Sequence, residues 1–340
     1  MTGHRQLWRK SAHYLVQQFA GWLMLTVAWS CAAETVSPPS PIVSIAFVGD
    51  VMLDDGPGQT IRRGKDPLAH VAAILNQSDI RVGNLECVIA TKGRPEPGKP
   101  YTFRAHPRTL KIVRRHFDAV ALANNHSGDF GPEAFVQMLD LLRQQGIGYF
   151  GGGRNLAQAH EPLIIERKGL RIALLGYNEF FPRSFEADVD RAGVAWSEDQ
   201  QVVLDIQNAR AVHHADLVIP MMHWGWEHDT LASERQRQLA RLMIDAGADA
   251  VVGGHPHVIQ NTEQYRGKPI IYSLSNFVFD GFDSLPTTTG WLLEMNVSRA
   301  GVHSWQARTV RIDARGTPRL ESPVPKQCWR RELPQSNDCS

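Results

Sequence analysis

Apolar and polar residues follow two alternating patterns between residues 42 and 257. Short apolar runs, several of them rich in β-branched residues, predict buried strands, and the segments between them carry apolar residues at helical spacing. This alternation predicts parallel strands joined by helices. The expected strands are 42–48, 80–86, 119–123, 217–222 and 250–252, and the expected helices are 66–76, 107–116, 132–145, 198–214 and 233–246.

Beyond residue 257 the pattern changes to pairs of strands joined by short turns. Residues 259–264 pair with 270–274, and 291–297 pair with 305–312. An earlier pair, 163–165 and 172–175, is either a hairpin or two sequential strands. Strand–helix units followed by hairpins predict two packed sheets with helices outside, in a single α/β domain over residues 42–312. From residue 313 to 340 the chain is polar and rich in proline, which predicts a tail.

The first 33 residues have the layout of a secretory signal peptide. A basic start is followed by a mostly apolar stretch, 14–27, and then by small residues up to Ala33. The proline-rich segment 34–41 predicts a linker. We therefore expect an exported protein, periplasmic or at the cell surface, that touches a membrane only through this segment. Two alternatives are a retained single-span anchor and a lipoprotein modified at Cys31.

Composition narrows the possible partners. The chain has 340 residues, 43% of them hydrophobic, which is enough for a sizeable core. Lys and Arg (36) nearly balance Asp and Glu (35), so the net charge of +1 provides no field for nucleic acid. In an oxidising compartment Cys328 and Cys339 are expected to form a disulfide, the alternative being two free thiols.

Residues that can bind metals follow the expected strands. Carboxylates, an amide and imidazoles form a mixed nitrogen and oxygen set, which suits Zn, Mn or Fe and is compatible with one or two ions. In open α/β sheets ligands gather beyond the carboxyl ends of the strands, so these side chains are expected to converge. The candidates are Asp50, Glu86, Asn125, His126, His223, His255 and His257.

The densest of these motifs is Gly253-Gly254-His255-Pro256-His257. The paired glycines allow a sharp turn after the strand, and extended backbone would point both imidazoles to one side. A loop with two solvated histidines is the alternative for this motif alone. The other strand-end residues favour a metal site.

Three residues beside these motifs could line a substrate cleft: Arg104, Trp224 and Asn276. For each of them ordinary packing or solvation is the alternative. The stretch 93–100 has the spacing of a phosphate-binding loop, but Pro100 replaces the required hydroxyl. No His-Glu-x-x-His helix supports a zinc peptidase.

The ordered motifs resemble the CapA family of capsule and poly-γ-glutamate synthesis proteins, over residues 43 to about 310. That family is similar in turn to the calcineurin-like metallophosphoesterases. The resemblance implies a four-layer α/β/β/α sandwich of metallophosphoesterase type with a dinuclear metal centre. The motifs are Gly49-Asp50, Asn84-Leu85-Glu86, Asn124-Asn125-His126, His223-Trp224-Gly225, Gly254-His255-Pro256-His257 and Ser273-Leu274-Ser275-Asn276-Phe277.

By position, the resemblance also implies roles. Asp50 and His257 would bind one metal and Glu86 would bridge, while the second metal would be held by Asn125, His223 and His255. His126 would protonate a leaving group. Two departures concern the first metal: the superfamily usually has a histidine where this chain has Met52, and an aspartate where it has Glu86.

Together these features predict an exported, metal-dependent, hydrolase-like protein of capsule or poly-γ-glutamate biosynthesis. Its enzymatic form would hydrolyse a phosphoester or an amide. The expected partner is an anionic cell-surface polymer or its synthase complex. The alternative is a non-catalytic assembly or export partner of a membrane polymer synthase, and Met52 favours that alternative.

Overall fold

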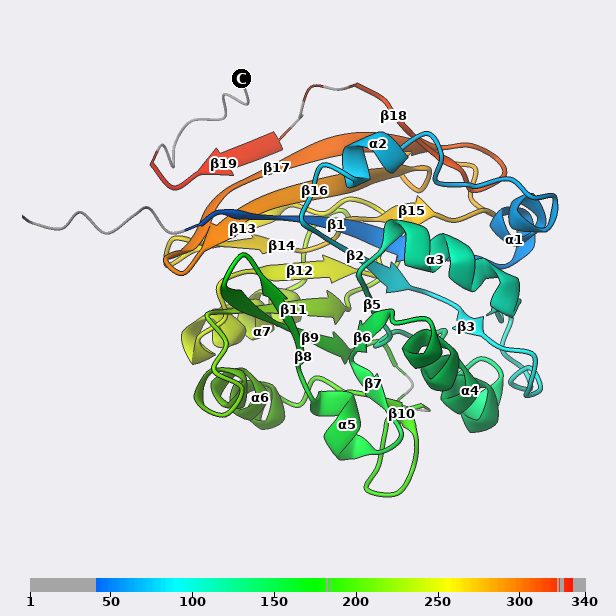
Figure 1. The fold of residues 1–340 in the computed structure, drawn as a ribbon, viewed down its shortest axis with the longest axis horizontal. Coiled ribbons are helices and arrows are strands. Elements are labelled where there is room, and N and C mark those ends of the chain that lie inside the picture. Colours follow the sequence, from blue (N-terminus) through cyan, green and yellow to red (C-terminus); the bar gives the residue numbers. More distant parts are fainter. Residues whose placement is uncertain (1–40, 182, 184, 323, 325–326, 333–340) are drawn as a thin grey trace, which may run out of the picture. The chain divides into compact units, whose positions relative to one another are not determined.

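Two β-sheets face each other and carry helices on their outer sides (Figure 1). The computed structural model describes residues 41–181, 183, 185–322, 324 and 327–332, all within one unit, Ser40–Ser340. The expected signal peptide and the linker to residue 40 lie outside the described residues, as does Cys339. Cys328 is disulfide-bonded, and its pairing with Cys339 stays a prediction.

The first sheet has nine strands and is mixed. Its parallel half runs β1-β2-β5-β6, and antiparallel strands continue it on the other side of β1 in the order β16, β17, β18. β15 pairs with β1, and β19 pairs with β17. The strands are β1 Val43–Val51, β2 Ile80–Leu85, β5 Ala119–Ala121, β6 Gly148–Phe150, β15 Asn276–Val278, β16 Thr289–Ser298, β17 Gly301–Ile312, β18 Pro318–Leu320 and β19 Gln327–Arg330.

The second sheet has six strands in the order β13-β14-β12-β11-β9-β8. Its four central strands are parallel, and each edge strand closes a hairpin. The strands are β8 Leu163–Arg167, β9 Leu170–Asn178, β11 Leu217–His223, β12 Val251–Gly254, β13 Thr262–Tyr265 and β14 Lys268–Ile271. Two short pairs lie apart from the sheets, β3 Val88–Ile89 with β4 Arg104–Ala105 and β7 Gly152–Gly153 with β10 Gly193–Val194.

The alternation of side chains along the strands explains the layers. In β1, Ile45 and Phe47 pack between the two sheets, whereas Ala46 and Val48 pack under the helices of the first sheet. β9 divides its residues in the same way. Three apolar cores therefore separate four layers, and the expected α/β/β/α sandwich is confirmed.

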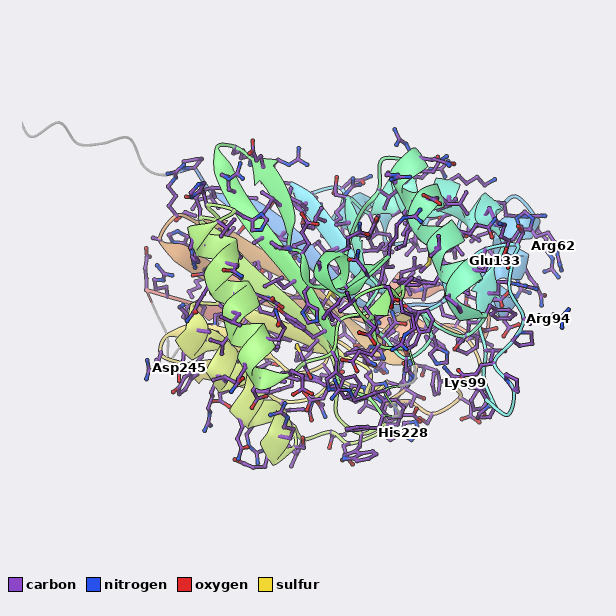
Figure 2. All side chains as sticks on the ribbon, turned by 90° about the horizontal axis from the view of Figure 1, so that it is seen from below. Arg62, Arg94, Lys99, Glu133, His228 and Asp245 are labelled. Carbon is purple, nitrogen blue, oxygen red and sulfur yellow. The ribbon has the colours of Figure 1, made fainter. Side chains whose placement is uncertain are left out.

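Helices cover the outer faces. α3 Leu110–His116 and α4 Gly131–Gln144 contribute to the core outside the first sheet, and α5 Leu156–His160, α6 Asp199–Ala211 and α7 Glu234–Ala246 to the core outside the second. Figure 2 shows Asp245, near the end of α7, at the opposite end of the view from Arg62 and Arg94. Among the described residues, no helix is long and apolar enough to cross a membrane.

Three segments differ from the sequence-based expectation. Within 66–76 only α2 Ala72–Leu75 is an α-helix, because the Asp66 side chain accepts the Leu68 N–H at 2.9 Å and holds a turn. The expected tail contributes β18 and β19, which pair with β17. Helix α1 Asp55–Arg62 was not expected, since Gly56, Pro57 and Gly58 obscure its pattern.

Candidate metal centre

Asp50 lies near the end of β1, at the centre of the first sheet. Its Cα is in register with Asn84 of β2 on one side and with Asn276 of β15 on the other. The chain packs so closely here that a Cβ on Gly49 would lie 1.7 Å from the Ser275 carbonyl oxygen. Gly49 is therefore required for β1 to reach this position.

The other ionisable candidates reach the same place from both sheets. Glu86 follows β2, and its N–H donates to the Val51 carbonyl at 3.0 Å. His223 ends β11, and His255 directly follows β12, the strand next to β11. The parallel strands of both sheets thus deliver ligand-type side chains at their carboxyl ends. Asp50, Glu86, His223, His255 and His257 are all buried.

The His255-Pro256-His257 motif reaches the site by a different backbone path than expected. Gly253 and Gly254 continue β12, and the turn begins at His255. His255 and His257 have φ values of 94° and 55°, which are left-handed and not extended. Both rings still converge, with centroids 5.9 Å apart. Non-glycine residues in this region cost free energy, and such strain is concentrated at functional sites.

Asn84, which was not among the predicted ligands, organises the cluster. Its Nδ2 donates to Asp50 Oδ1 at 2.8 Å and lies 3.5 Å from Glu86 Oε2 and 3.3 Å from His223 Nδ1. Asn124 fixes the Asn84 amide in turn, by donating to its Oδ1 at 3.0 Å. One amide group therefore links both carboxylates to a histidine of the other sheet.

Asn125 and His255 meet at one nitrogen of His223. His223 Nε2 lies 2.7 Å from Asn125 Oδ1 and 3.1 Å from His255 Nδ1. This joins the three residues that the resemblance assigns to the second metal. On the other side, His257 Nδ1 lies 3.5 Å from Asp50 Oδ2, the pair assigned to the first metal.

The residues present fit a metal ion. Two sets of side chains bring their ligand atoms within 4.8 Å of one another: Glu86 with His255 and His257, and Asp50 with Glu86 and His223. Glu86 Oε1 and His255 Nε2 are buried and have no hydrogen-bond partner among the described residues. Such atoms cost free energy, and a cation between them removes that cost. The site is thus a candidate centre for a divalent metal.

Burial determines the charge states of these groups. It raises the pKa of Asp50, with His257 partly opposing the effect, and burial together with Asp50 raises the pKa of Glu86 well above its ordinary value. Burial and neighbouring histidines lower the pKa values of His223 and His255 far below the ordinary value. Neutral imidazoles are the form that binds metals, and a cation would favour the ionised carboxylates.

His126 lies beside the cluster and points one ring nitrogen toward it. Its Nε2 is 4.0 Å from Glu86 Oε1, and its Nδ1 is 2.8 Å from Asp129 Oδ2. Asp129 is buried and also accepts from Phe103 N–H at 2.7 Å and from Lys99 Nζ at 2.5 Å. Sequence reasoning missed Asp129, although its spacing of three residues from His126 could have indicated it.

Lys99 comes from the stretch that was set aside as a false phosphate-binding loop. Its lysine donates to the Asn125 carbonyl oxygen as well as to Asp129, each at 2.5 Å. Lys99 therefore connects the backbone of a candidate ligand with the partner of His126.

The three residues expected beside a substrate make the following contacts in the structure, and their role in substrate binding stays a prediction. Trp224 is buried in the core outside the second sheet, and its Nε1–H donates to the Tyr272 carbonyl at 2.9 Å. Asn276 is buried, and its Oδ1 lies 2.8 Å from His257 Nδ1, so it orients that imidazole. Arg104 donates to the carbonyls of Lys92 and Gly93 and stacks on Phe130.

Met52, at the position where the resemblance implies a histidine, is fully buried in the apolar core. Its sulfur lies 3.1 Å from the Asp54 N–H, which donates to it. A thioether in this position offers little to a hard or borderline metal.

Four layers and a buried carboxylate–histidine cluster at the strand ends define a layered α/β protein with a candidate metal site. The chain belongs to the bacterial capsule synthesis protein PGA_cap family, whose match covers residues 44–281.

Curated relatives agree with this family. The PGA biosynthesis protein CapA of Bacillus subtilis is 34% identical over 266 residues, which are 76% of this chain and 70% of the relative. The capsule biosynthesis protein CapA of Bacillus anthracis is 31% identical over 270 residues, 76% of this chain and 66% of that protein. The match to the second relative thus spans slightly less than two thirds of its length.

Solved structures show more distant similarity. A Haemophilus influenzae NAD nucleotidase has a TM-score of 0.45 at 14% identity, covering 83% of this chain and 54% of that chain. A Thermus thermophilus sulfate thiohydrolase has a TM-score of 0.46 at 12% identity, covering 81% and 57%. Scores of this size support no inference about activity.

Proposed function

We propose that this chain is a metal-dependent hydrolase of capsule or poly-γ-glutamate biosynthesis that acts on a cell-surface polymer. The observation that carries the proposal is the convergence of Asp50, Glu86, His223 and His255 from two sheets, where two buried ligand-type atoms have no hydrogen-bond partner in the described part of the chain. The names of the curated relatives support the role in capsule synthesis. The protein would act after export, beside the synthase that makes the polymer.

The metal would be held by the two sets that share Glu86, and Asn125 would add an amide oxygen. This mixture of ligands suits Zn, Mn or Fe, as one ion or two. Such an ion polarises the bond to be cleaved and makes water nucleophilic near neutral pH. The buried Met52 supplies no hard ligand, which favours a weaker site on the side of Asp50.

His126 would handle the proton of the leaving group. Asp129 accepts from Nδ1, so Nε2 is the nitrogen that faces the reacting side. The histidines are also shielded from solvent, because phenylalanine rings pack against three of them. The pairs are Phe103 with His126, Phe180 with His255 and Phe282 with His257, with centroids 4.5, 4.1 and 5.0 Å apart.

The decisive experiment measures bound metal in His255→Ala. We expect elemental analysis to show a divalent transition metal in the wild-type protein and a clear loss in this variant. His214→Ala is the matched control, because His214 is exposed and also has positive φ, so both variants carry a similar backbone change. Equal metal content in all three proteins would contradict the proposal.

Activity is tested on the metal-loaded wild-type protein with a chromogenic phosphodiester and with a γ-glutamyl amide. We expect hydrolysis of one of these two bond types, and its loss in His255→Ala. A protein that binds metal but cleaves neither would instead support the non-catalytic role in polymer assembly.

A further inference from the structure

Positive charge is concentrated in one segment of the chain. Residues 92–116 contain eight Lys or Arg and one Asp or Glu, whereas the whole chain has 36 and 35. A run of like charges is usually a solvated face, so its meaning depends on whether the fold neutralises it. The net charge of +1 conceals this segment, because an excess of acidic residues elsewhere offsets it.

Most of these cations have no carboxylate partner. Among the described residues, three of the eight form ion pairs with a carboxylate: Lys92, Lys99 and Arg115. Other cations of the segment, and those around the end of α1, are exposed and form no ion pair in the described part of the chain. These seven residues, which we call the basic surface, are Arg62, Arg63, Lys65, Arg94, Arg108, Lys111 and Arg114.

The basic surface extends over neighbouring elements. Arg62, at the end of α1, and Arg108, in the turn before α3, line one hollow of about 250 Å³. Lys111 and Arg114 follow on the exposed side of α3, one helical turn apart. Figure 2 shows Arg62 and Arg94 at the same end of the molecule. The cations therefore gather at one end of the described unit.

The nearest carboxylates lie at the start of α1. Asp54 and Asp55 begin this helix, and the Asp280 side chain accepts a backbone N–H of its first turn at 2.7 Å. At a rise of about 1.5 Å per residue, this is about 10 Å along the helix from Arg62. Asp54 and Asp55 share the hollow with Arg62 and Arg108, so the excess of positive charge lies outside it, on α3 and at the end of α1.

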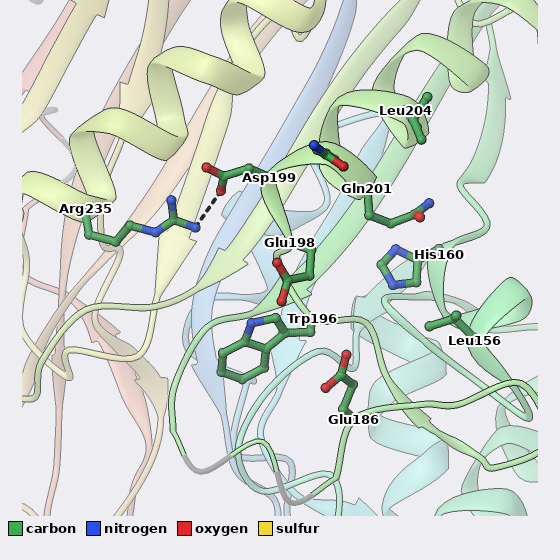
Figure 3. Close-up of a pocket in the computed structure, with 10 residues that line it drawn as sticks. Leu156, His160, Glu186, Trp196, Glu198, Asp199, Gln201, Leu204 and Arg235 are labelled. Carbon is green, nitrogen blue, oxygen red and sulfur yellow. Dashed lines mark hydrogen bonds and ion pairs between the residues drawn. The ribbon is translucent and has the colours of Figure 1, made fainter.

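A second hollow, beside α6, has the opposite character. Its volume is about 710 Å³, and Glu186, Glu198 and Asp199 line it (Figure 3). The dashed line in Figure 3 marks the contact of Arg235 with Asp199, which neutralises the charge of that arginine. An anionic ligand is therefore attracted to the basic surface and not to the hollow beside α6.

The loop of residues 92–99 connects the basic surface with the candidate metal centre. Arg94 is exposed in this loop, and Lys99 donates from its end to the Asn125 carbonyl oxygen. Arg104 of β4 holds the loop by donating to the Gly93 carbonyl at 3.1 Å. Five residues span at most about 17 Å, so a ligand that crosses Arg94 is within reach of the metal centre.

We propose that the basic surface binds an extended polyanionic chain through its charge, at a site separate from the metal centre. Cations spread over a loop and two helices fit negative charges that repeat along a flexible chain. A small anion would meet only one or two of them. The surface is independent of the metal centre, and only the choice of a glutamate polymer as the probe rests on the proposed function.

An anionic bilayer is the other partner that such charge could attract. Proteins that dock on bilayers also insert apolar side chains. Among the described residues, none of the strongly exposed large apolar side chains comes from α1 or α3. The surface also includes a hollow, which a flat bilayer would bridge and a flexible chain can enter. These features favour the chain.

The first test measures binding of a γ-linked glutamate oligomer of about 20 units to the wild-type protein by calorimetry. A γ-linked glutamine oligomer of equal length is the neutral control. We expect only the glutamate oligomer to bind, at least about tenfold more weakly in about 0.5 M than in about 0.05 M NaCl, because salt screens exposed charges. Equal binding of both oligomers, or binding that does not respond to salt, would overturn recognition by charge.

The second test locates the site with the double variant Arg62→Gln/Lys111→Gln. Affinity for the glutamate oligomer should fall about 3–20-fold, since each exposed ion pair changes an affinity about 1.5–5-fold. Arg241→Gln/Arg266→Gln is the matched control, because it removes the same charge at the opposite end, where Arg266 pairs with Asp245 (Figure 2). Equal losses in the two variants would show that binding follows net charge alone and would overturn the site.

His255→Ala separates the basic surface from the metal centre. This variant should bind the oligomer as tightly as the wild type although its metal is lost. Loss of both together would place the chain at the metal centre and refute the separate site. Absence of metal from the wild type, with oligomer binding intact, would refute the proposed function alone.

Vesicles of phosphatidylglycerol distinguish the chain from a bilayer. At about 0.15 M NaCl, an excess of vesicles should leave the bound oligomer in place. Release of the oligomer by the vesicles would assign the basic surface to an anionic bilayer and overturn the proposal.

Discussion

Asn84 is the residue on which the geometry of the cluster depends most. One buried amide nitrogen contacts Asp50, Glu86 and His223, so its removal leaves two carboxylates without this donor. We expect Asn84→Ala to lose about 1–3 kcal/mol of unfolding free energy, the usual cost of unpaired buried polar groups. Metal affinity should fall about 10–100-fold, as for other residues that orient ligands.

Calorimetric metal titration and urea unfolding measure these two effects. Asn76→Ala is a suitable control, because Asn76 is exposed and, among the described residues, its side chain accepts only from Arg81. Metal affinity that is unchanged in Asn84→Ala would show that the ligands hold their positions without the amide.

Variants of His126 and Asp129 should affect proton transfer without affecting metal binding. If the protein is a hydrolase, His126→Ala should lower kcat about 10²–10⁴-fold with its metal content unchanged. Asp129→Asn should lower kcat less, because it changes the orientation and tautomer of the imidazole and removes the ion pair with Lys99 but leaves the imidazole in place. The loss in His126→Ala should shrink for substrates whose leaving group needs no proton. Metal lost together with activity in His126→Ala would refute this division of roles.

At the scale of elements, the spacing of apolar residues along the sequence predicted most of the fold. The strand and helix patterns predicted the strand–helix alternation, the hairpins and the two sheets, because buried strands and amphipathic helices have distinct repeats. The ends of the strands then located most of the candidate ligands, since parallel strands in an open sheet bring such side chains to one edge. The missed α1 contains two glycines and a proline, which hide a helical pattern.

Contacts between distant segments were the part that the sequence could not supply. Lys99 meets Asp129 and Asn125 only because the fold brings the 93–100 loop against the turn after β5. Trp224 directly follows the candidate ligand His223 and still packs in the core outside the second sheet. Left-handed backbone at His255 and His257 likewise depends on tertiary packing, because nothing local requires it.

Asp66 links the start of the α2 segment to the end of α3 and should make stability depend on pH. Burial alone would raise the pKa of Asp66, but hydrogen bonds involving His116, the Leu68 N–H and Arg115 lower it to about 2. In the unfolded chain the Asp66 carboxyl has its ordinary pKa of 3.8. Between about pH 2 and pH 4 the unfolded chain therefore binds more protons at this group than the folded protein does. The ionised Asp66 therefore contributes its full stabilisation of the folded state above about pH 4, and this stabilisation is lost as the pH falls toward 2.

We expect Asp66→Asn to lose about 1–2 kcal/mol at neutral pH, a value reduced for the partial exposure of its ion pairs. Urea unfolding from pH 7 down to about pH 2.5 measures the difference from wild type, which should shrink steadily below about pH 4. A difference that stays constant over this range would mean that the carboxylate charge does not matter.

At the scale of the whole described unit, the candidate ligands join the two sheets. Asp50 and Glu86 come from β1 and the end of β2, while His223 and His255 come from the ends of β11 and β12. The two sheets pack against each other through the apolar core between them. The cluster of candidate ligands adds a polar contact between the sheets at the carboxyl ends of their strands. A bound metal would therefore cross-link both halves of the sandwich.

Metal removal should for this reason lower the stability of the entire sandwich. A ligand bound only by the native state, at about 100 times its Kd, stabilises it by about 2.7 kcal/mol. At about 2 cal/mol/K of unfolding entropy per residue, this lowers Tm on chelation by roughly 4 °C. Calorimetry should show one cooperative transition that shifts as a whole. The same chelator should leave the Tm of His255→Ala nearly unchanged, and an equal shift in that variant would mean that the metal binds elsewhere.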